Sequence, residues 1–269
     1  MSRSKLRRLP STLVAPAVLA AVIGLWELVV WLGDIKPFIL PPPSAVAVTF
    51  VEEWPTLMDN SKITLLEIGL GFGLGVIVGL VLAVIMALMP VVRAALYPLV
   101  LATQTTPKIA IAPLFIIWFG VGLLPKLLII ALLVFFPVLI NTLVGIQSVD
   151  KSQLALMRSV NSSQWQIYRH VRMPSAVPHI FASLKLGLTV AIIGAIVAEW
   201  VAANEGLGYL LIFYNSTLRT TELFAVLLML VLIASLAFVA ISLLERALSW
   251  EARLGTGEGA ATVTPEAAV

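Results

Sequence analysis

Long, nearly uninterrupted runs of apolar residues dominate the pattern of this chain, and polar residues gather in the segments between them. The runs lack the period-two alternation of membrane β-barrel strands. A helix of about 20 apolar residues crosses the ~30 Å hydrocarbon core of a bilayer and satisfies its own backbone hydrogen bonds there. The pattern therefore predicts an all-α integral membrane fold with about six spans: Leu13–Leu32, Ile63–Met89, Ala94–Phe119, Leu123–Ile146, Ile180–Ala202 and Leu223–Leu244.

The composition excludes a water-soluble domain, because hydrophobic residues make up 60% of the chain, charged residues 12%, and the mean hydropathy is +1.06. We expect a basic N-terminus (1–12), a transmembrane domain (13–250) and a disordered tail (251–269) rich in Gly, Ala, Thr and Glu. A basic start followed by an apolar run is also typical of a cleaved signal peptide. Leu13–Leu32 is longer than the apolar part of such a peptide and has no clear cleavage site, so we interpret it as the first transmembrane helix.

A charged segment of about thirty residues, Ser148–Pro178, interrupts the apolar runs, and we call it the island. Its sequence predicts two short helices, Lys151–Val160 and Gln164–Arg172. Proline lacks an N–H and clashes with the preceding helical turn, so Pro174 and Pro178 are expected to make an elbow before the next span. The helix starts are indicated by two residue pairs with capping-box spacing: Asp150 with Gln153 and Ser163 with Gln166.

The distribution of Lys and Arg predicts the orientation, because positively charged loops are retained in the cytoplasm. With the N-terminus inside, four basic residues lie in outer segments: Lys36, Lys62, Lys126 and Arg219. Eleven lie in inner segments: Arg3, Lys5, Arg7, Arg8, Arg93, Lys151, Arg158, Arg169, Arg172, Arg246 and Arg253. Both termini and the island are therefore expected in the cytoplasm, where the island is a docking surface. The net charge of +3 reflects this bias rather than binding of nucleic acid.

Polar residues inside spans are costly and by default face the bundle interior or a water-filled cavity. Pro107 removes a backbone donor in the third span, so we expect the preceding residues to line a translocation path: Gln104, Thr105 and Thr106. Glu199 and Trp200 in the fifth span are expected to form the opposing wall, with Trp200 stacking on a ring or acting as a gate. In the alternative, Gln104 and Glu199 make hydrogen bonds to neighbouring helices. Glu67 is expected to reach water near the end of its span.

Glycines in the second span share one helix face at four-residue spacing, which permits close approach of another helix. Packing inside one subunit and a dimer seam explain this face equally well: Gly71, Gly75 and Gly79. The outer segment Asp34–Ser61 contains three consecutive prolines and is expected to be stiff and extended.

Catalytic and metal-binding motifs are missing from the sequence. There is no phosphate-binding G-x-x-x-x-G-K-[ST] run, no G-x-S-x-G elbow and no H-E-x-x-H helix. The chain has no cysteine, and its two histidines, His170 and His179, have no cluster of carboxylates beside them. We therefore expect a protein that is not an enzyme, with no catalytic residue, no metal and no bound cofactor. Any driving hydrolysis of ATP belongs to a partner.

The island resembles the cytoplasmic loop of permease subunits of bacterial ABC importers, with the pattern E-A-A, three residues, G, nine residues, I-x-L-P. Ala155-Leu156-Met157 stand at E-A-A and Asn161 at the glycine. Val171, Met173 and Pro174 stand at I-x-L-P. Ala155 therefore replaces the acidic residue of the pattern, and Asn161 replaces its glycine. The run from Thr105 to Ile146, the segment SSQWQIYRHVRMPSAVP and AEWVAANEGLGYLL are similar to the permeases for nitrate, taurine and alkanesulfonates.

This resemblance implies the type I ABC importer permease fold in the bacterial inner membrane, with two usually identical copies. The implied partners are a cytoplasmic ATP-binding-cassette ATPase, an extracytoplasmic solute-binding protein and the lipid bilayer. The first island helix is then the coupling helix, and the implied coupling residues are Leu154, Ala155, Met157, Arg158, Asn161 and Pro174.

The substrate is the least determined part of this interpretation. PKIAIAP (Pro107–Pro113) looks like permeases for riboflavin and thiamine-pyrimidine precursors, while sulfonates or taurine, nitrate and aromatic acids are the alternatives. A different class, an ion-gradient-driven secondary transporter, would show inverted repeats and interrupted helices, and would have no need of a capped cytoplasmic island. A membrane scaffold without transport is disfavoured by polar residues at costly depths.

Overall fold

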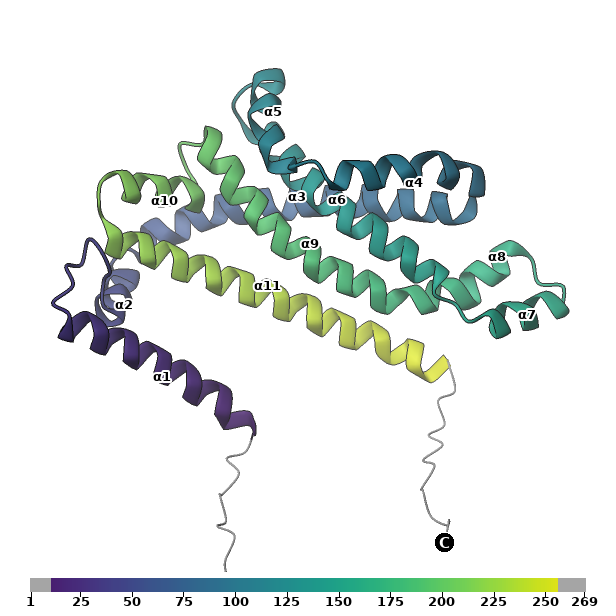
Figure 1. The fold of residues 1–269 in the computed structure, drawn as a ribbon, viewed down its shortest axis with the longest axis horizontal. Helices are drawn as coiled ribbons and strands as arrows, with labels where there is room; N and C mark the ends of the chain where they lie inside the picture. The colour runs from purple at the N-terminus through teal and green to yellow at the C-terminus, as the bar shows by residue number, and fades with distance from the viewer. Residues whose placement is uncertain (1–10, 256–269) are drawn as a thin grey trace, which may run out of the picture. The chain divides into compact units, whose positions relative to one another are not determined.

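The computed structural model describes residues 11–255 of the chain, and the elements in this part are helices (Figure 1). They fall into two compact units. One is built from the chain up to residue 65 together with residues 203–232, and the other from residues 66–202 together with the chain from 233. Helices α3 (Trp54–Leu88) and α11 (Thr220–Gly255) contribute residues to both units.

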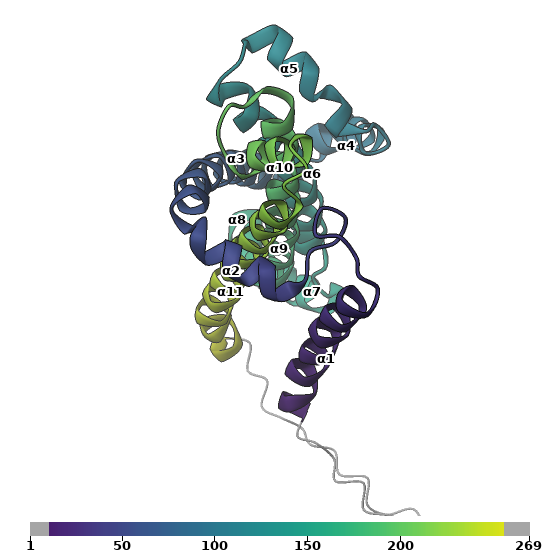
Figure 2. The ribbon, with the colours of Figure 1, turned by 90° about the vertical axis from the view of Figure 1, so that its left-hand side faces the viewer.

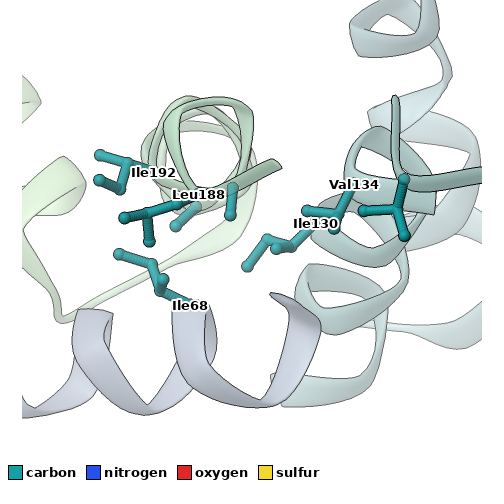
Figure 3. Packing of buried hydrophobic residues seen from close by; sticks show 8 residues of the cluster. Ile68, Ile130, Val134, Leu188 and Ile192 are labelled. Carbon is teal, nitrogen blue, oxygen red and sulfur yellow. The ribbon is translucent and has the colours of Figure 1, made fainter. Parts of the chain in front are cut away.

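The core of the second unit lies where α6 (Leu123–Gln147) and α9 (Met173–Ala202) pack with the later part of α3. These helices are apolar on nearly all sides, as expected for buried or membrane-embedded helices. Figure 3 shows five members of the buried cluster on the three helices: Ile68, Ile130, Val134, Leu188 and Ile192.

The glycine face of α3 packs inside this unit, against α6. A Cβ atom added at Gly71 would lie 2.6 Å from Ile130, and one at Gly75 would lie 2.7 Å from the carbonyl oxygen of Ala131. One at Gly79 would lie 3.0 Å from the carbonyl oxygen of Phe135. The glycines therefore serve close packing within one subunit, as small residues do between membrane helices.

Helices α3 and α6 run parallel in constant register. Glu67 pairs with Lys126 at a separation of 59 residues, and the same separation joins each glycine to the branched side chain that it contacts. The pairs are Gly71 with Ile130, Gly75 with Val134 and Gly79 with Val138. This order is what two spans crossing the membrane in the same direction require.

In the first unit, α1 (Ser11–Leu32) contacts α2 (Pro43–Glu52) through a cap. The backbone N–H and the hydroxyl of Ser44 donate to the Glu27 carboxylate at 3.0 and 2.7 Å. The expectation of an extended outer segment is therefore wrong, because α2 and the start of α3 are helical. Proline is favoured at the first position of a helix, where its missing N–H is not needed, and Pro43 stands there.

The third predicted span, Ala94–Phe119, is not one continuous helix. It consists of α4 (Pro90–Gln104), the short 3₁₀ helix η1 (Lys108–Ile111) and α5 (Ala112–Phe119). The two parts meet at 90°, and Figure 2 shows α5 turning away from α4. Pro107 causes the break, because it removes a helical donor and disfavours helical backbone at the residue before it. Five described helices are long and apolar enough to span, and the bent pair makes a sixth.

The remaining spans agree with the predicted ones in number and order, with shifted ends. Helix α3 begins at Trp54, nine residues before the predicted start at Ile63, and α11 extends to Gly255, past the start of the predicted tail at 251. Residues 1–10 of the predicted basic N-terminus and 256–269 of the tail lie outside the described residues.

The predicted elbow of the island is wrong. Helix α7 (Lys151–Ser159) is separate, but α8 (Gln164–Ile167) continues through a π-helical turn, η2 (Tyr168–Arg172), into α9, so that one helical segment runs from 164 to 201. Pro174 lies in the first turn of α9. The wider π-helical turn before it accommodates Pro174, which cannot donate a backbone N–H, without ending the helix.

Candidate functional site

Helix α7 of the island is fixed at its N-terminus by Asp150. The carboxylate accepts a hydrogen bond from the Ser152 N–H at 3.0 Å, rather than from the position that a capping box with Gln153 would use. This backbone hydrogen bond lowers the pKa of Asp150, because it stabilises the carboxylate. The anion also lies at the positive end of the helix.

The C-terminus of α7 is fixed by a Schellman motif. The N–H of Ser162 donates to the Met157 carbonyl and the N–H of Asn161 donates to the Arg158 carbonyl, both at 3.0 Å. Asn161 has φ +54°, in the left-handed region that favours glycine and tolerates asparagine. This geometry explains why the permease loop pattern has glycine here, and why asparagine is an acceptable replacement in this chain.

No residue of α7 is buried, and its apolar side chains lie on two faces. Leu154 and Met157 are half-buried, whereas Leu156 is 66% exposed and Val160 is similarly exposed. Sequence reasoning chose Leu154 and Met157 and missed the second pair. The four-residue spacing of Leu156 and Val160 would have been the signal for a second helix face.

The island is anchored to the ends of two spans, as Figure 1 shows for α7 and α8 at one end of α6 and α9. Tyr168 is buried in a cluster with Ile146 of α6 and Ala176 of α9. Ser163 caps α8 with a complete capping box to Gln166, which confirms that prediction. Among the candidate coupling residues, Pro174 is half-buried and lies two residues before Ala176 in the sequence. Ala155, Arg158 and Asn161 are exposed.

The candidate path residues Gln104, Thr105 and Thr106 are exposed and stand at the 90° break. The Thr105 hydroxyl donates to the carbonyl of Ala102, in the preceding turn, at 2.8 Å. The break therefore places a short polar segment between two apolar helices.

Glu199 and Trp200 point to different sides of α9. Glu199 is 1% exposed, whereas Trp200 is 50% exposed. Ala198, the preceding residue, shares a buried cluster with Ala112 at the start of α5 and Ile129 of α6. The structure thus brings the segment after the break to the part of α9 that carries these two residues, but only Trp200 reaches the surface of the subunit.

Ion pairs join spans of the second unit within the described residues, and the sequence analysis missed them. Lys126 Nζ lies 2.6 Å from Glu67 Oε1 in a buried pair between α3 and α6. The sequence analysis counts Lys126 with the basic residues of the outer side and expects Glu67 to reach water, whereas in the structure both side chains are buried in this pair. Lys185 Nζ lies 2.5 Å from Glu245 Oε2, joining α9 and α11 in a partly exposed pair. Opposite charges at matching depths of two spans were the available signal.

The glycine turn before α10 (Leu207–Ser216) is fixed to α3 within the first unit. The Gly206 N–H donates to the Asn60 side chain at 2.7 Å and the Leu207 N–H donates to the Thr64 hydroxyl at 2.9 Å. Gly206 has φ +107°, which glycine adopts without strain. Gly208 of the predicted turn lies within α10.

Histidine and carboxylate side chains do not assemble a metal site within residues 11–255. His170 Nδ1 contacts the carbonyl oxygen of Gln166 at 3.0 Å, along its own helix. The Cβ of His179 occupies the space beside Gly145, where an added Cβ would lie 2.6 Å away. Both histidines therefore contact neighbouring protein residues: His170 contacts its own helix, and His179 packs against Gly145.

Known proteins resemble this chain over most of its length. The family model for the binding-protein-dependent transport system inner membrane component matches residues 75–250. The riboflavin transport system permease protein RibX of Chloroflexus aurantiacus is 37% identical, with 88% of this chain and 90% of the relative covered. The formylaminopyrimidine transport permease protein ThiX of Halalkalibacterium halodurans is 33% identical, with 79% and 86% covered.

A third relative, the taurine transport system permease protein TauC of Escherichia coli, is 31% identical, with 86% of each chain covered. The solved structure of an amino acid ABC transporter with histidines shares the fold, with a TM-score of 0.60, 21% identity, and 76% of this chain and 97% of that chain covered. The sequence relatives are named as transport permeases rather than enzymes. The chain belongs to the family of binding-protein-dependent transport system inner membrane components and is an ABC transporter permease of the nitrate, taurine and sulfonate branch.

Proposed function

We propose that this permease is the membrane path of an importer whose motion is driven by a separate cytoplasmic ATPase docked on α7. The observation that carries the proposal is a helix capped at both ends that exposes Leu156 and Val160 outside the membrane spans. Apolar side chains exposed in such a place are typical of a protein interface. Ala155 removes the acidic residue of the family pattern, so apolar contact and Arg158 supply the binding.

Packing of the second half of the island against the spans supports this role, and the short segments 148–150 and 160–163 join α7 to these packed elements. The cluster of Ile146, Tyr168 and Ala176 ties the island to the ends of α6 and α9, and the continuous segment 164–201 leads from the island into the bundle. Motion between sites is transmitted by packed elements that contact both of them. A movement of α7 is therefore expected to reach both spans through these short connections and the buried cluster.

The proposal places both termini and the island in the cytoplasm, where most basic residues gather. It includes a second copy of the chain and an extracytoplasmic binding protein that delivers the solute. This chain itself binds no ATP. The path runs beside the break in the third span, with Gln104, Thr105 and Thr106 on one side and Trp200, backed by the buried Glu199, on the other.

We propose a heteroaromatic vitamin or precursor as the substrate, such as riboflavin or a pyrimidine precursor of thiamine. Two relatives named for such solutes are 37% and 33% identical to this chain, against 32% and 31% for relatives named for sulfonates and taurine. The exposed Trp200 supports the choice, because an indole ring offers a stacking face to an aromatic solute.

Uptake into proteoliposomes containing the permease, its ATPase and its binding protein tests this substrate. Riboflavin or formylaminopyrimidine should be taken up with ATP, and a tenfold excess of taurine or nitrate should not compete. Trp200→Ala should reduce uptake while Trp31→Ala, which removes an exposed tryptophan of α1, should not. ATP-dependent uptake of taurine with no uptake of either heteroaromatic compound would overturn the assignment.

A further inference from the structure

A cavity of about 360 Å³ lies between the end of α3 and the first turns of α4, and its lining includes no residue of the proposed path or of α7. Its volume is in the range of ligand pockets. Both flanking segments belong to the second unit. The residues that line it combine apolar side chains with one cation and one phenol: Met86, Ala87, Pro90, Arg93, Ala94, Tyr97 and Pro98.

Arg93 gives the cavity its charge. The guanidinium carbon lies 5.8 Å from the centroid of the Tyr97 ring, which holds the side chain beside the opening. Arg93 is the single charged residue in the sequence between Glu67 and Lys108. Within the part of the chain that the structure describes, Arg93 forms no ion pair with an acidic side chain. The complementary ligand group is therefore an anion from outside the subunit.

The surroundings of Arg93 are apolar on both sides of the cavity. Met86 is buried in the cluster that α3, α4 and α6 share, and it forms part of the floor. The turn between the two helices exposes Leu88, Met89 and Val91, and Val91 is 82% exposed. An exposed apolar turn with a single arginine and a tyrosine is typical of the boundary between hydrocarbon and water.

Helix α4 also lacks one backbone hydrogen bond donor beside the cavity. Pro98 has no N–H to donate to the carbonyl of Ala94, one helical turn earlier, and both residues line the cavity. A headgroup that carries hydroxyl groups offers the donor that the proline lacks. The cavity thus presents a cation and an apolar floor in one place, beside a helical turn that lacks one N–H donor.

We propose that this cavity binds an anionic phospholipid, with the phosphate diester at Arg93 and the upper part of an acyl chain against Met86 and Ala87. Basic pockets between transmembrane helices on the cytoplasmic side are suited to anionic headgroups. The proposal rests on the proposed orientation for the leaflet concerned, which is the inner one. The cavity lies outside the coupling and path residues, so the lipid is a structural partner rather than the transported solute.

Native mass spectrometry of the full-length permease in detergent tests the site, with phosphatidylglycerol and phosphatidylcholine of equal chain length as probes. The wild type should prefer phosphatidylglycerol. Arg93→Gln should weaken phosphatidylglycerol binding about fivefold, as expected for one basic residue at an anionic surface, and leave phosphatidylcholine binding unchanged. Arg93→Lys should keep most of the preference. Ala94→Leu, which fills the cavity and retains the charge, should weaken the binding of both lipids.

Arg169→Gln is the matched control, because it removes an exposed arginine of the island, and it should bind both lipids as the wild type does. Equal phosphatidylglycerol affinity of wild type and Arg93→Gln would overturn the proposal. Loss of the ATPase from Arg93→Gln, with lipid binding unchanged, would assign the surface to the ATPase instead. Lipid binding is measured on the permease without its ATPase. The result therefore does not depend on whether α7 couples the permease to the ATPase.

Discussion

The seam between α3 and α6 and the island helix α7 use small and large residues in opposite ways. In the seam, glycines at 71, 75 and 79 receive large side chains of the facing helix, and the ion pair between Glu67 and Lys126 is buried. In α7, no residue is buried, and large apolar side chains face outward. The seam is packed by residues of one subunit. Helix α7 is capped at both ends, but its exposed apolar face has no packing partner within the described part of the subunit. The difference separates a region built for stability from a region built for a partner.

The largest effect on the seam is expected from breaking its ion pair. Lys126→Met leaves Glu67 in the buried seam without its lysine, and removal of one member of a buried pair costs about 3–5 kcal/mol. Thermal unfolding of the purified permease should shift strongly downward. The double variant Glu67→Gln with Lys126→Met should recover most of the loss, because neither charge remains. A single variant as stable as the wild type would show that the pair does not hold the seam.

Steric filling of the seam is expected to rank second. Gly75→Leu places a side chain against the Ala131 carbonyl and Val134, and overpacking of this kind costs about 1–3 kcal/mol or more. Gly73→Leu is the control on the same helix, since an added Cβ there meets nothing within 4 Å. Thermal stability of the purified permease should fall for Gly75→Leu alone. Equal losses in both variants would mean that the glycine face is not tightly packed.

The C-terminal cap of α7 allows a sharper test of the island. Asn161→Val forces a β-branched residue into the left-handed region at a cost of about 1–2 kcal/mol. Asn161→Gly restores the family residue and should retain or improve the cap. Hydrogen exchange of peptides covering 151–162 should accelerate for the valine variant only. Faster exchange in the glycine variant would contradict the Schellman motif as the reason for this residue.

The smallest expected effect is that of acid on the N-terminal cap. The pKa of Asp150 is lowered in the folded state, so its stabilisation of α7 is present above the ordinary value of 3.8 and is lost as the pH falls through the lowered folded value. The exchange rate of α7 in Asp150→Asn relative to wild type, measured at each pH, should approach one as the pH falls below 3.8. A ratio that does not change with pH would exclude the charge as the source of the cap's effect.

The spans could be predicted from the sequence wherever an apolar run has no internal break. Helix α6 differs from its prediction by one residue at the C-terminal end, because its run is apolar on all sides. The prediction of a continuous third span is wrong, because a run of apolar residues does not reveal that the chain turns by 90° at Pro107. The predicted island elbow is wrong because Pro174 does not break the helix: the π-helical turn at 168–172 precedes it and accommodates the missing N–H within one continuous helical segment.

The sequence predicts where helix α7 lies but not which of its faces is exposed. Capping residues and charge located α7, and the family pattern located Asn161. The exposed face of Leu156 and Val160 depends on how α7 lies against the rest of the island, which local sequence does not specify. The Glu67–Lys126 pair was missed because its members lie 59 residues apart and meet through the register of two helices. Helix α2 was missed because three prolines were read as extended chain.

Binding of the ATPase to the permease tests the docking role of α7 most directly. Leu156→Asp places a charge on the exposed apolar face and should reduce co-purification of the ATPase and ATP-driven uptake together, with unchanged thermal stability, because a charge in an apolar contact is strongly penalised. Leu154→Asp and Met157→Asp probe the half-buried face. Ser152→Asp adds the same charge in the first turn, where the helix N-terminus favours an anion, and should bind normally. Full ATPase binding and uptake in Leu156→Asp, Leu154→Asp and Met157→Asp would contradict docking on α7.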